Sequence, residues 1–122
     1  MKIKISALDS KFSYYIRSRD NWTCQRCLKE YKPPTNGLHN SHFWGRARKS
    51  VRFDPKNCQA LCHGCHSFFT ANPELHRQFY LKKIGEKEYN ALMLRANTPG
   101  KPDYELLNIW LAKEVKKASS NE

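Results

Sequence analysis

The feature that most constrains this chain is a repeated Cys-x-x-Cys spacing. One pair is formed by Cys24 and Cys27, and the other by Cys62 and Cys65. Two such turns present four thiolates to one ion, which is a common ligand set of tetrahedral structural zinc sites. Residues 28–61 separate the pairs, a longer connection than in a compact zinc finger, which leaves room for functional residues. We therefore predict a structural Zn²⁺ bound by these four cysteines.

Residues close to the second pair leave one alternative open. His63 and His66 flank Cys65, and either histidine in place of a cysteine would also complete a zinc site. We otherwise expect His63 to face solvent. The fifth thiol, Cys58, stands outside the repeated spacing and is predicted to be a small buried residue.

Length and composition limit the size of the core and indicate the kind of partner. The 122 residues suit one domain with a limited core, which a bound metal would help to stabilise. Lys and Arg number 22 against 11 acidic residues, and a net charge of +11 favours DNA as the partner over an anionic membrane surface. No apolar run is long enough to span a membrane. The first ten residues lack the features of a secretion signal, so we expect a cytoplasmic protein, in which CxxC pairs bind metal rather than form disulfides.

Periodicity and turn signals predict an α+β domain over residues 1–122, with a core at about 22–71 and a helical extension at about 72–118. Short extended segments are predicted at 38–44 and 51–53, and residues 1–5 fit either a strand or an unpaired tail. Helices are predicted from Asp9 to about 21, at 63–71, from Pro73 to a stop at Gly85, at 86–97, and after a cap at Asp103.

Three polar residues lie between and just beyond the cysteines: His42, Asn57 and His66. Together with the segments FSYYIRSRDNWTCQRC and NCQALCHGCH, they resemble the HNH endonucleases, which have a ββα-metal (His-Me finger) core. The resemblance covers most of residues 12–70. The segment FYLKKIGEKEYNAL also resembles the Rap/NinG recombination endonucleases of lambdoid phages.

The resemblance implies a metal-dependent DNA endonuclease, with branched or recombination intermediates among its candidate substrates. His42 matches the general base, because an imidazole with a pKa near 6.5 accepts a proton at neutral pH. Asn57 matches the residue that orients the base and its loop. His66 matches a ligand of a catalytic Mg²⁺ or Mn²⁺, distinct from the zinc, which would polarise the phosphate and stabilise the leaving 3′ oxygen.

The chain departs from the family at one position. The family usually has Asp or His directly before the base, as a second metal ligand, and here Ser41 occupies that place. His39 would point to the same side of a strand as Ser41, so His39 and Ser41 are both candidate ligands beside His66. Direct ligation by Asn57 is a further alternative.

A basic segment separates the predicted base from Asn57. Its cations are Arg46, Arg48, Lys49 and Arg52, and we predict that they bind DNA phosphates. The alternative is a solvated basic loop. Phe43 and Trp44 fit either a wedge into DNA or core packing. The Ser41 departure also favours a rival function, a non-catalytic zinc-containing module that binds DNA.

Overall fold

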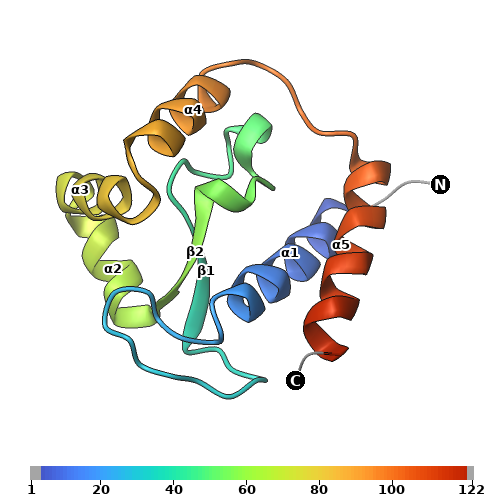
Figure 1. Ribbon diagram of the computed structural model, residues 1–122, viewed down its shortest axis with the longest axis horizontal. Helices are drawn as coiled ribbons and strands as arrows, with labels where there is room; N and C mark the ends of the chain where they lie inside the picture. The colour runs from blue at the N-terminus through green and yellow to red at the C-terminus, as the bar shows by residue number, and fades with distance from the viewer. Residues whose placement is uncertain (1–3, 121–122) are drawn as a thin grey trace.

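The protein, described here by a computed structural model, is built around one β-hairpin between two groups of helices (Figure 1). The structure describes residues 4–120, with side chains to 117. The helices are α1 (Ile5–Arg19), α2 (His63–Ala71), α3 (Pro73–Ile84), α4 (Glu86–Ala96) and α5 (Tyr104–Ser120), and the strands are β1 (Leu38–His42) and β2 (Cys58–Cys62). The α+β class with flanking helices is therefore observed.

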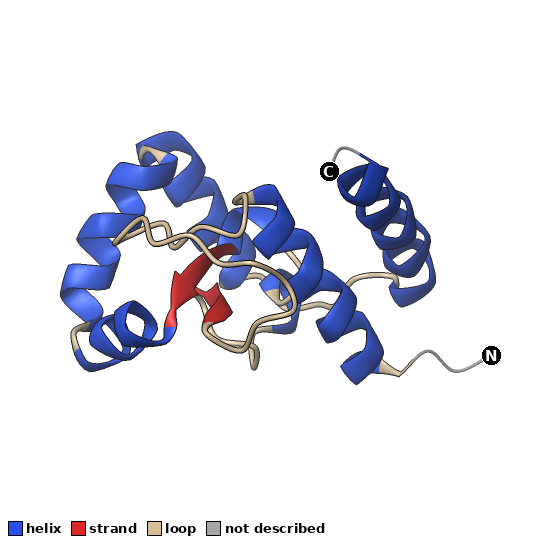
Figure 2. Cartoon of the chain, turned by 90° about the horizontal axis from the view of Figure 1, so that it is seen from below, coloured by secondary structure: helices blue, strands red, loops and turns tan. Residues whose placement is uncertain are grey.

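The two strands are antiparallel, and their register separates the two candidate sites. Leu38 pairs with Cys62 at one end, and His42 pairs with Cys58 at the other. The cysteine pairs consequently lie near the end where β2 leads into α2. His42 and the connection at 43–57 lie at the opposite end of the hairpin. Figure 2 shows the short sheet enclosed by helices.

The predicted extended segment at 51–53 is wrong. Lys49–Val51 forms a 3₁₀ helix, and the strand that pairs with β1 is Cys58–Cys62. Val51 is buried against α4, whereas Phe53 is buried against α1 and α5. In an extended segment Val51 and Phe53 would point to the same side, so they could not be buried in two different clusters. The chain therefore turns here.

Helix α1 begins earlier than its sequence pattern predicts. It starts at Ile5 rather than at a cap formed by Asp9 or Ser10, and no side chain caps it. The reason is tertiary, because Leu8 is fully buried in one cluster with Leu111 of α5, and this packing stabilises the extra turn. The predicted strand or tail concerned residues 1–5, of which 1–3 lie outside the described part.

Three clusters of buried side chains hold the elements together. Trp22 and Phe69 belong to the cluster around the hairpin and α2, beside the first cysteine pair. Leu8 and Leu111 join α1 to α5, which lie side by side in Figures 1 and 2. Tyr80 joins α3 to α4 and the 3₁₀ segment.

The C-terminal helices follow the predicted boundaries closely. Gly85 ends α3 with a φ of 87°, a conformation that glycine adopts without strain. Asp103 accepts hydrogen bonds from the backbone N–H groups of Glu105 and Leu106 and so caps α5. No helix within residues 4–120 has the length and apolar character needed to cross a membrane.

Candidate functional site

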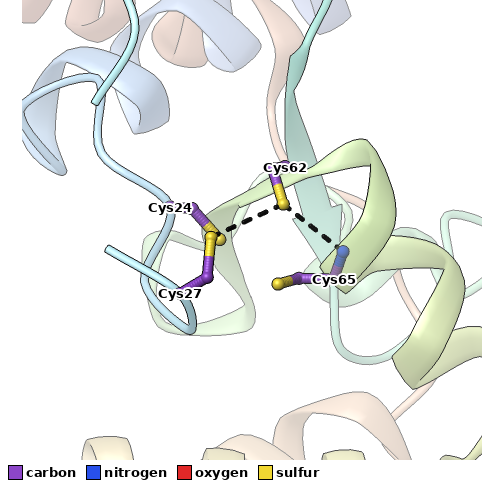
Figure 3. Close-up of side chains that lie close together, drawn as sticks. All are labelled: Cys24, Cys27, Cys62 and Cys65. Atoms are coloured by element: carbon purple, nitrogen blue, oxygen red, sulfur yellow. Dashed lines mark hydrogen bonds between the residues drawn. The ribbon is translucent and has the colours of Figure 1, made fainter. Parts of the chain in front are cut away.

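The four predicted cysteine ligands come together (Figure 3). The sulfur atoms of Cys24, Cys27, Cys62 and Cys65 all lie within 4.8 Å of one another. The Sγ atoms of Cys27 and Cys62 are 3.8 Å apart, close to the roughly 3.8 Å expected for two thiolates on one tetrahedral zinc at about 2.3 Å. These four thiols can hold a structural metal ion.

The ionisation of the cluster favours a bound cation. Burial works to raise the pKa of Cys24, but nearby backbone N–H groups, first that of Cys27, lower it to about 6. Burial raises the pKa of Cys65 to about 12. Thiols this close cannot all ionise without a positive charge between them, and a divalent metal supplies that charge. Cys58 lies outside the cluster, and burial raises its pKa well above the ordinary value, as expected for an inert buried thiol.

The histidines near the second cysteine pair form a group of their own. His63 is exposed, and its ring centroid lies 5.5 Å from that of His39. The Nδ1 atom of His66 lies 3.0 Å from the Nδ1 atom of His39. Within residues 4–120, the four cysteines are the only cluster of three or more metal-binding side chains of the Cys, His, Asp and Glu types. The four-thiol set is thus complete without a histidine.

The His39–His66 pair fits a catalytic metal in part. Two imidazole nitrogens bound at right angles to one ion, each at about 2.1 Å, lie about 3 Å apart, which is the observed separation. A hydrogen bond between the two rings fits the same distance. Burial lowers the pKa of His66, and the neighbouring rings of His39 and His63 lower it further. His66 is therefore held in the neutral form that binds metals.

Ser41 does not offer its hydroxyl to solvent. Its side chain is 1 % exposed, and its Oγ has no hydrogen-bond partner. It lies opposite Gln59 across the hairpin, and both polar atoms of that side chain are also buried without a partner. His39 is therefore the better of the two candidates for a second ligand beside His66.

Asn57 is hydrogen-bonded to the backbone of the connection that follows β1. Its Nδ2 donates to the carbonyl oxygens of Trp44 (2.9 Å) and Val51 (3.0 Å), and its Oδ1 accepts from the backbone N–H of Trp44 (2.8 Å). The side chain is fully buried and bonded to the backbone, which disfavours direct metal ligation by Asn57. These bonds tie the two ends of the connection at 43–57 together.

We expect Asn57→Ala to lower the free energy of unfolding by about 2–4 kcal/mol, because it removes three hydrogen bonds of a buried side chain to the backbone of Trp44 and Val51. Urea unfolding measures this. Asn90 is exposed on α4, so Asn90→Ala is the matched control and should change stability by less than about 0.5 kcal/mol. Equal effects of the two substitutions would contradict the positioning role.

His42 is oriented by the backbone. Its Nε2 lies 2.8 Å from the carbonyl oxygen of Arg52. A carbonyl only accepts, so Nε2 carries the proton and Nδ1 keeps its lone pair. Burial lowers the pKa of His42, the Arg52 carbonyl opposes this shift, and Arg46 adds to it. The imidazole is thus neutral at neutral pH and equipped to accept a proton.

His42 and His66 line two adjoining hollows. We call the first the α1 groove. It has a volume of about 600 Å³ and is bordered by Ser13, Arg17, Asn40 and Arg46 in addition to the two histidines. The second, of about 710 Å³, is the aromatic pocket, bordered by Phe43, Trp44, Phe69 and His76 in addition to the same histidines. A substrate in either hollow therefore reaches both His42 and His66.

Most of the side chains that border the aromatic pocket are packed against other aromatic rings. Phe43 stacks on Tyr80 with ring centroids 4.8 Å apart, which favours its core-packing interpretation. His76 stacks on Phe69 at 4.6 Å. Burial lowers the pKa of His76 to about 4, and His66 adds to the shift, so His76 stays neutral at physiological pH.

The four predicted DNA-binding cations divide into two kinds. Arg46 borders the α1 groove and is exposed, and Lys49 is exposed as well. Arg52 instead makes two hydrogen bonds to Asp9, at 3.1 and 2.5 Å, which anchor the segment that holds His42. Arg48 binds the C-terminal end of α4 through the Ala96 carbonyl and lies over the Trp44 ring. Arg46 and Lys49 therefore remain the better candidates for phosphate contact.

Sequence reasoning missed the α1 side of the groove. Ser13 and Arg17 lie one turn apart on α1, next to the buried positions Phe12 and Ile16. Their i, i+4 spacing was the available signal. What the sequence did not show is that this polar stripe faces His42.

Comparisons with known proteins were made on the whole chain. No family model, characterised protein or solved structure matches it. Function is therefore inferred from side-chain chemistry and geometry. In the structure His42 ends the first strand, Asn57 directly precedes the second, and His66 lies on the helix that follows.

Proposed function

We propose that this protein is a zinc-containing, divalent-metal-dependent DNA endonuclease of the HNH type. One observation carries the proposal. His42, with its Nδ1 left free to accept a proton, shares two hollows with His66, whose Nδ1 lies 3.0 Å from that of His39. A base next to a pair of metal-binding nitrogens is what metal-assisted phosphodiester hydrolysis needs.

Each residue has a separate task in this proposal. His42 takes the proton from the attacking water at Nδ1, while its Nε2–H stays on the Arg52 carbonyl. His39 and His66 would hold a catalytic Mg²⁺ or Mn²⁺, and the chemistry such an ion would supply is polarisation of the phosphate and stabilisation of the leaving oxygen. Asn57 keeps the connection at 43–57 closed, so that the Arg52 carbonyl stays in reach of His42.

The charge of the molecule supports DNA as the substrate. The net charge is +11, and the exposed Arg46 stands at the edge of the α1 groove beside His42. A polyanion would be attracted to such a surface, with an affinity that falls steeply as salt rises, because binding releases condensed counterions.

A cleavage assay tests the proposal directly. Supercoiled plasmid is incubated with the purified zinc-loaded protein and Mn²⁺ or Mg²⁺, and a parallel reaction contains no added metal. We expect nicked and linear products only with metal. Linear, nicked and four-way junction DNA, compared in the same assay, show whether branched substrates are preferred. Absence of cleavage on every substrate with either metal would contradict the proposal.

The second candidate is a zinc-containing DNA-binding module without catalysis. Ser41 favours it, because the hydroxyl at the family's ligand position is buried and leaves only two histidine nitrogens for a catalytic metal. Salt-dependent DNA binding without cleavage by the same preparation would favour this candidate.

The pH dependence of cleavage follows from the environment of His42. Its pKa is lowered from 6.5, chiefly by burial, so the neutral base persists until the pH falls below 6.5. We expect single-turnover rates to stay level from neutral pH down to about 6.5 and to fall below it. Arg46→Gln removes a cation that lowers this pKa, so the acid limb should move to higher pH.

Arg48→Gln is the matched control for that shift. It removes one positive charge from the same segment, but Arg48 is not among the groups that shift the pKa of His42. Its acid limb should therefore coincide with that of the wild type. An acid limb that does not move in Arg46→Gln would contradict the assignment of His42 as the titrating base.

A further inference from the structure

The α1 groove contains a cation without a counter-ion. Arg17 is half-buried, and within the described residues 4–120 no carboxylate lies within ion-pair distance of it. Its Nε donates to the Ser13 carbonyl (3.3 Å), its Nη1 donates to the Thr35 carbonyl (3.3 Å), and its Cζ lies 4.9 Å from the centre of the Trp22 ring. The guanidinium is thus fixed in place by neutral groups, with its charge uncompensated.

A second polar group in the groove also lacks a partner. The Oδ1 atom of Asn40, on β1, is buried and accepts no hydrogen bond. Because that oxygen is buried, the NH₂ group is the end of the Asn40 side chain that is open to the groove. A ligand with oxygen acceptors would accept hydrogen bonds from this NH₂ group.

From these two observations we infer that the α1 groove binds a DNA phosphate next to the scissile one. Arg17 supplies the charge, and the Ser13 hydroxyl and the Asn40 amide supply hydrogen bonds. The inference rests on the proposed function for the identity of the ligand. A guanidinium with free Nη donors matches the geometry of phosphate oxygens.

The groove also contains the carboxylate of Asp9, whose charge is already paired and so does not prevent anion binding. Asp9 also borders the α1 groove, but it is hydrogen-bonded to Arg52 and lies 4.0 Å from Arg46. Its charge is therefore balanced within the protein, while that of Arg17 is not.

Because Arg17 is held in a fixed position, its contact with a phosphate would also position the DNA strand. Its side chain is ordered before DNA binds, so little conformational entropy is lost in making the contact. Arg17 and His42 border one groove, so a phosphate held by Arg17 sets where the strand runs relative to the base. Arg17 is accordingly a positioning residue, and it should act on binding more than on the chemical step.

Equilibrium binding of a short fluorescent DNA duplex, without added Mg²⁺ or Mn²⁺, tests the inference at several salt concentrations. We expect Arg17→Gln to weaken binding about tenfold at low salt and to reduce the slope of log K against log salt by about one. Lys87 is exposed on α4 and does not border the α1 groove, so Lys87→Gln is the charge-matched control and should change affinity less than twofold.

Asn40→Ala separates binding from folding. Arg17→Gln also removes a bond to Thr35, whereas Asn40 has no Oδ1 partner to lose. Asn40→Ala should therefore weaken DNA binding several-fold while the melting temperature stays unchanged. Wild-type affinity and salt slope in both variants would overturn the inference even if the protein cleaves DNA. Conversely, weakened binding in both variants, with a wild-type protein that never cleaves, would sustain the phosphate site and refute the endonuclease.

Discussion

Cys62→Ser is expected to unfold the protein and abolish zinc binding. Cys62 ends β2, accepts a hydrogen bond from the Cys65 backbone N–H at 3.4 Å, and lies 3.8 Å from the sulfur of Cys27. In zinc-finger peptides a structural zinc contributes about 10–16 kcal/mol. That is comparable to the whole stability of a small domain, about 5–15 kcal/mol. Loss of one thiolate should therefore remove the cooperative unfolding transition.

Zinc content and thermal unfolding measure this expectation together. The wild-type protein, purified without added metal, should contain close to one zinc per chain. Cys58 lies outside the cluster and is buried, so Cys58→Ala is the matched control. It should keep the zinc and lose only about 1 kcal/mol of stability. A folded, metal-free Cys62→Ser protein with the wild-type melting temperature would show that the cluster holds no structural metal.

His42→Ala is expected to abolish DNA cleavage, by about 10²–10⁴-fold or more, without loss of fold or DNA binding. In the proposed mechanism the imidazole is the proton acceptor, and it makes one hydrogen bond, to the Arg52 carbonyl. It takes no part in the cysteine cluster. None of the proposed phosphate contacts involves the His42 side chain, so DNA affinity should persist.

Two further histidine variants make the test specific. His66→Ala should weaken the binding of the catalytic metal and leave the base in place. Excess Mn²⁺ should therefore restore part of the activity of His66→Ala but none of the activity of His42→Ala. His76→Ala removes an imidazole that borders the aromatic pocket but not the α1 groove, and it should leave the cleavage rate near that of the wild type. Cleavage by folded His42→Ala at the wild-type rate would refute the assignment of the base.

The sequence by itself determined the features that depend on neighbouring residues. The CxxC spacing places two sulfurs on one turn, and the structure brings both pairs together as predicted. The stop at Gly85 and the cap at Asp103 were readable because a φ of 87° and an Asx cap involve only a few adjacent positions. Helix α2 likewise has its predicted bounds, His63–Ala71.

Only the tertiary structure decided what lies across the chain from each of these residues. The start of α1 depends on Leu8 packing against Leu111, more than a hundred positions away, which no local pattern encodes. Arg52 belongs to the basic segment in the sequence, yet in the fold it forms an ion pair with Asp9. The helical pattern says nothing about a role for Arg17, and only the packing of α1 on the hairpin places it in one groove with His42. Helix caps and turns are set by short-range sterics and hydrogen bonds, whereas the sharing of one groove by distant side chains is set by how the buried faces pack.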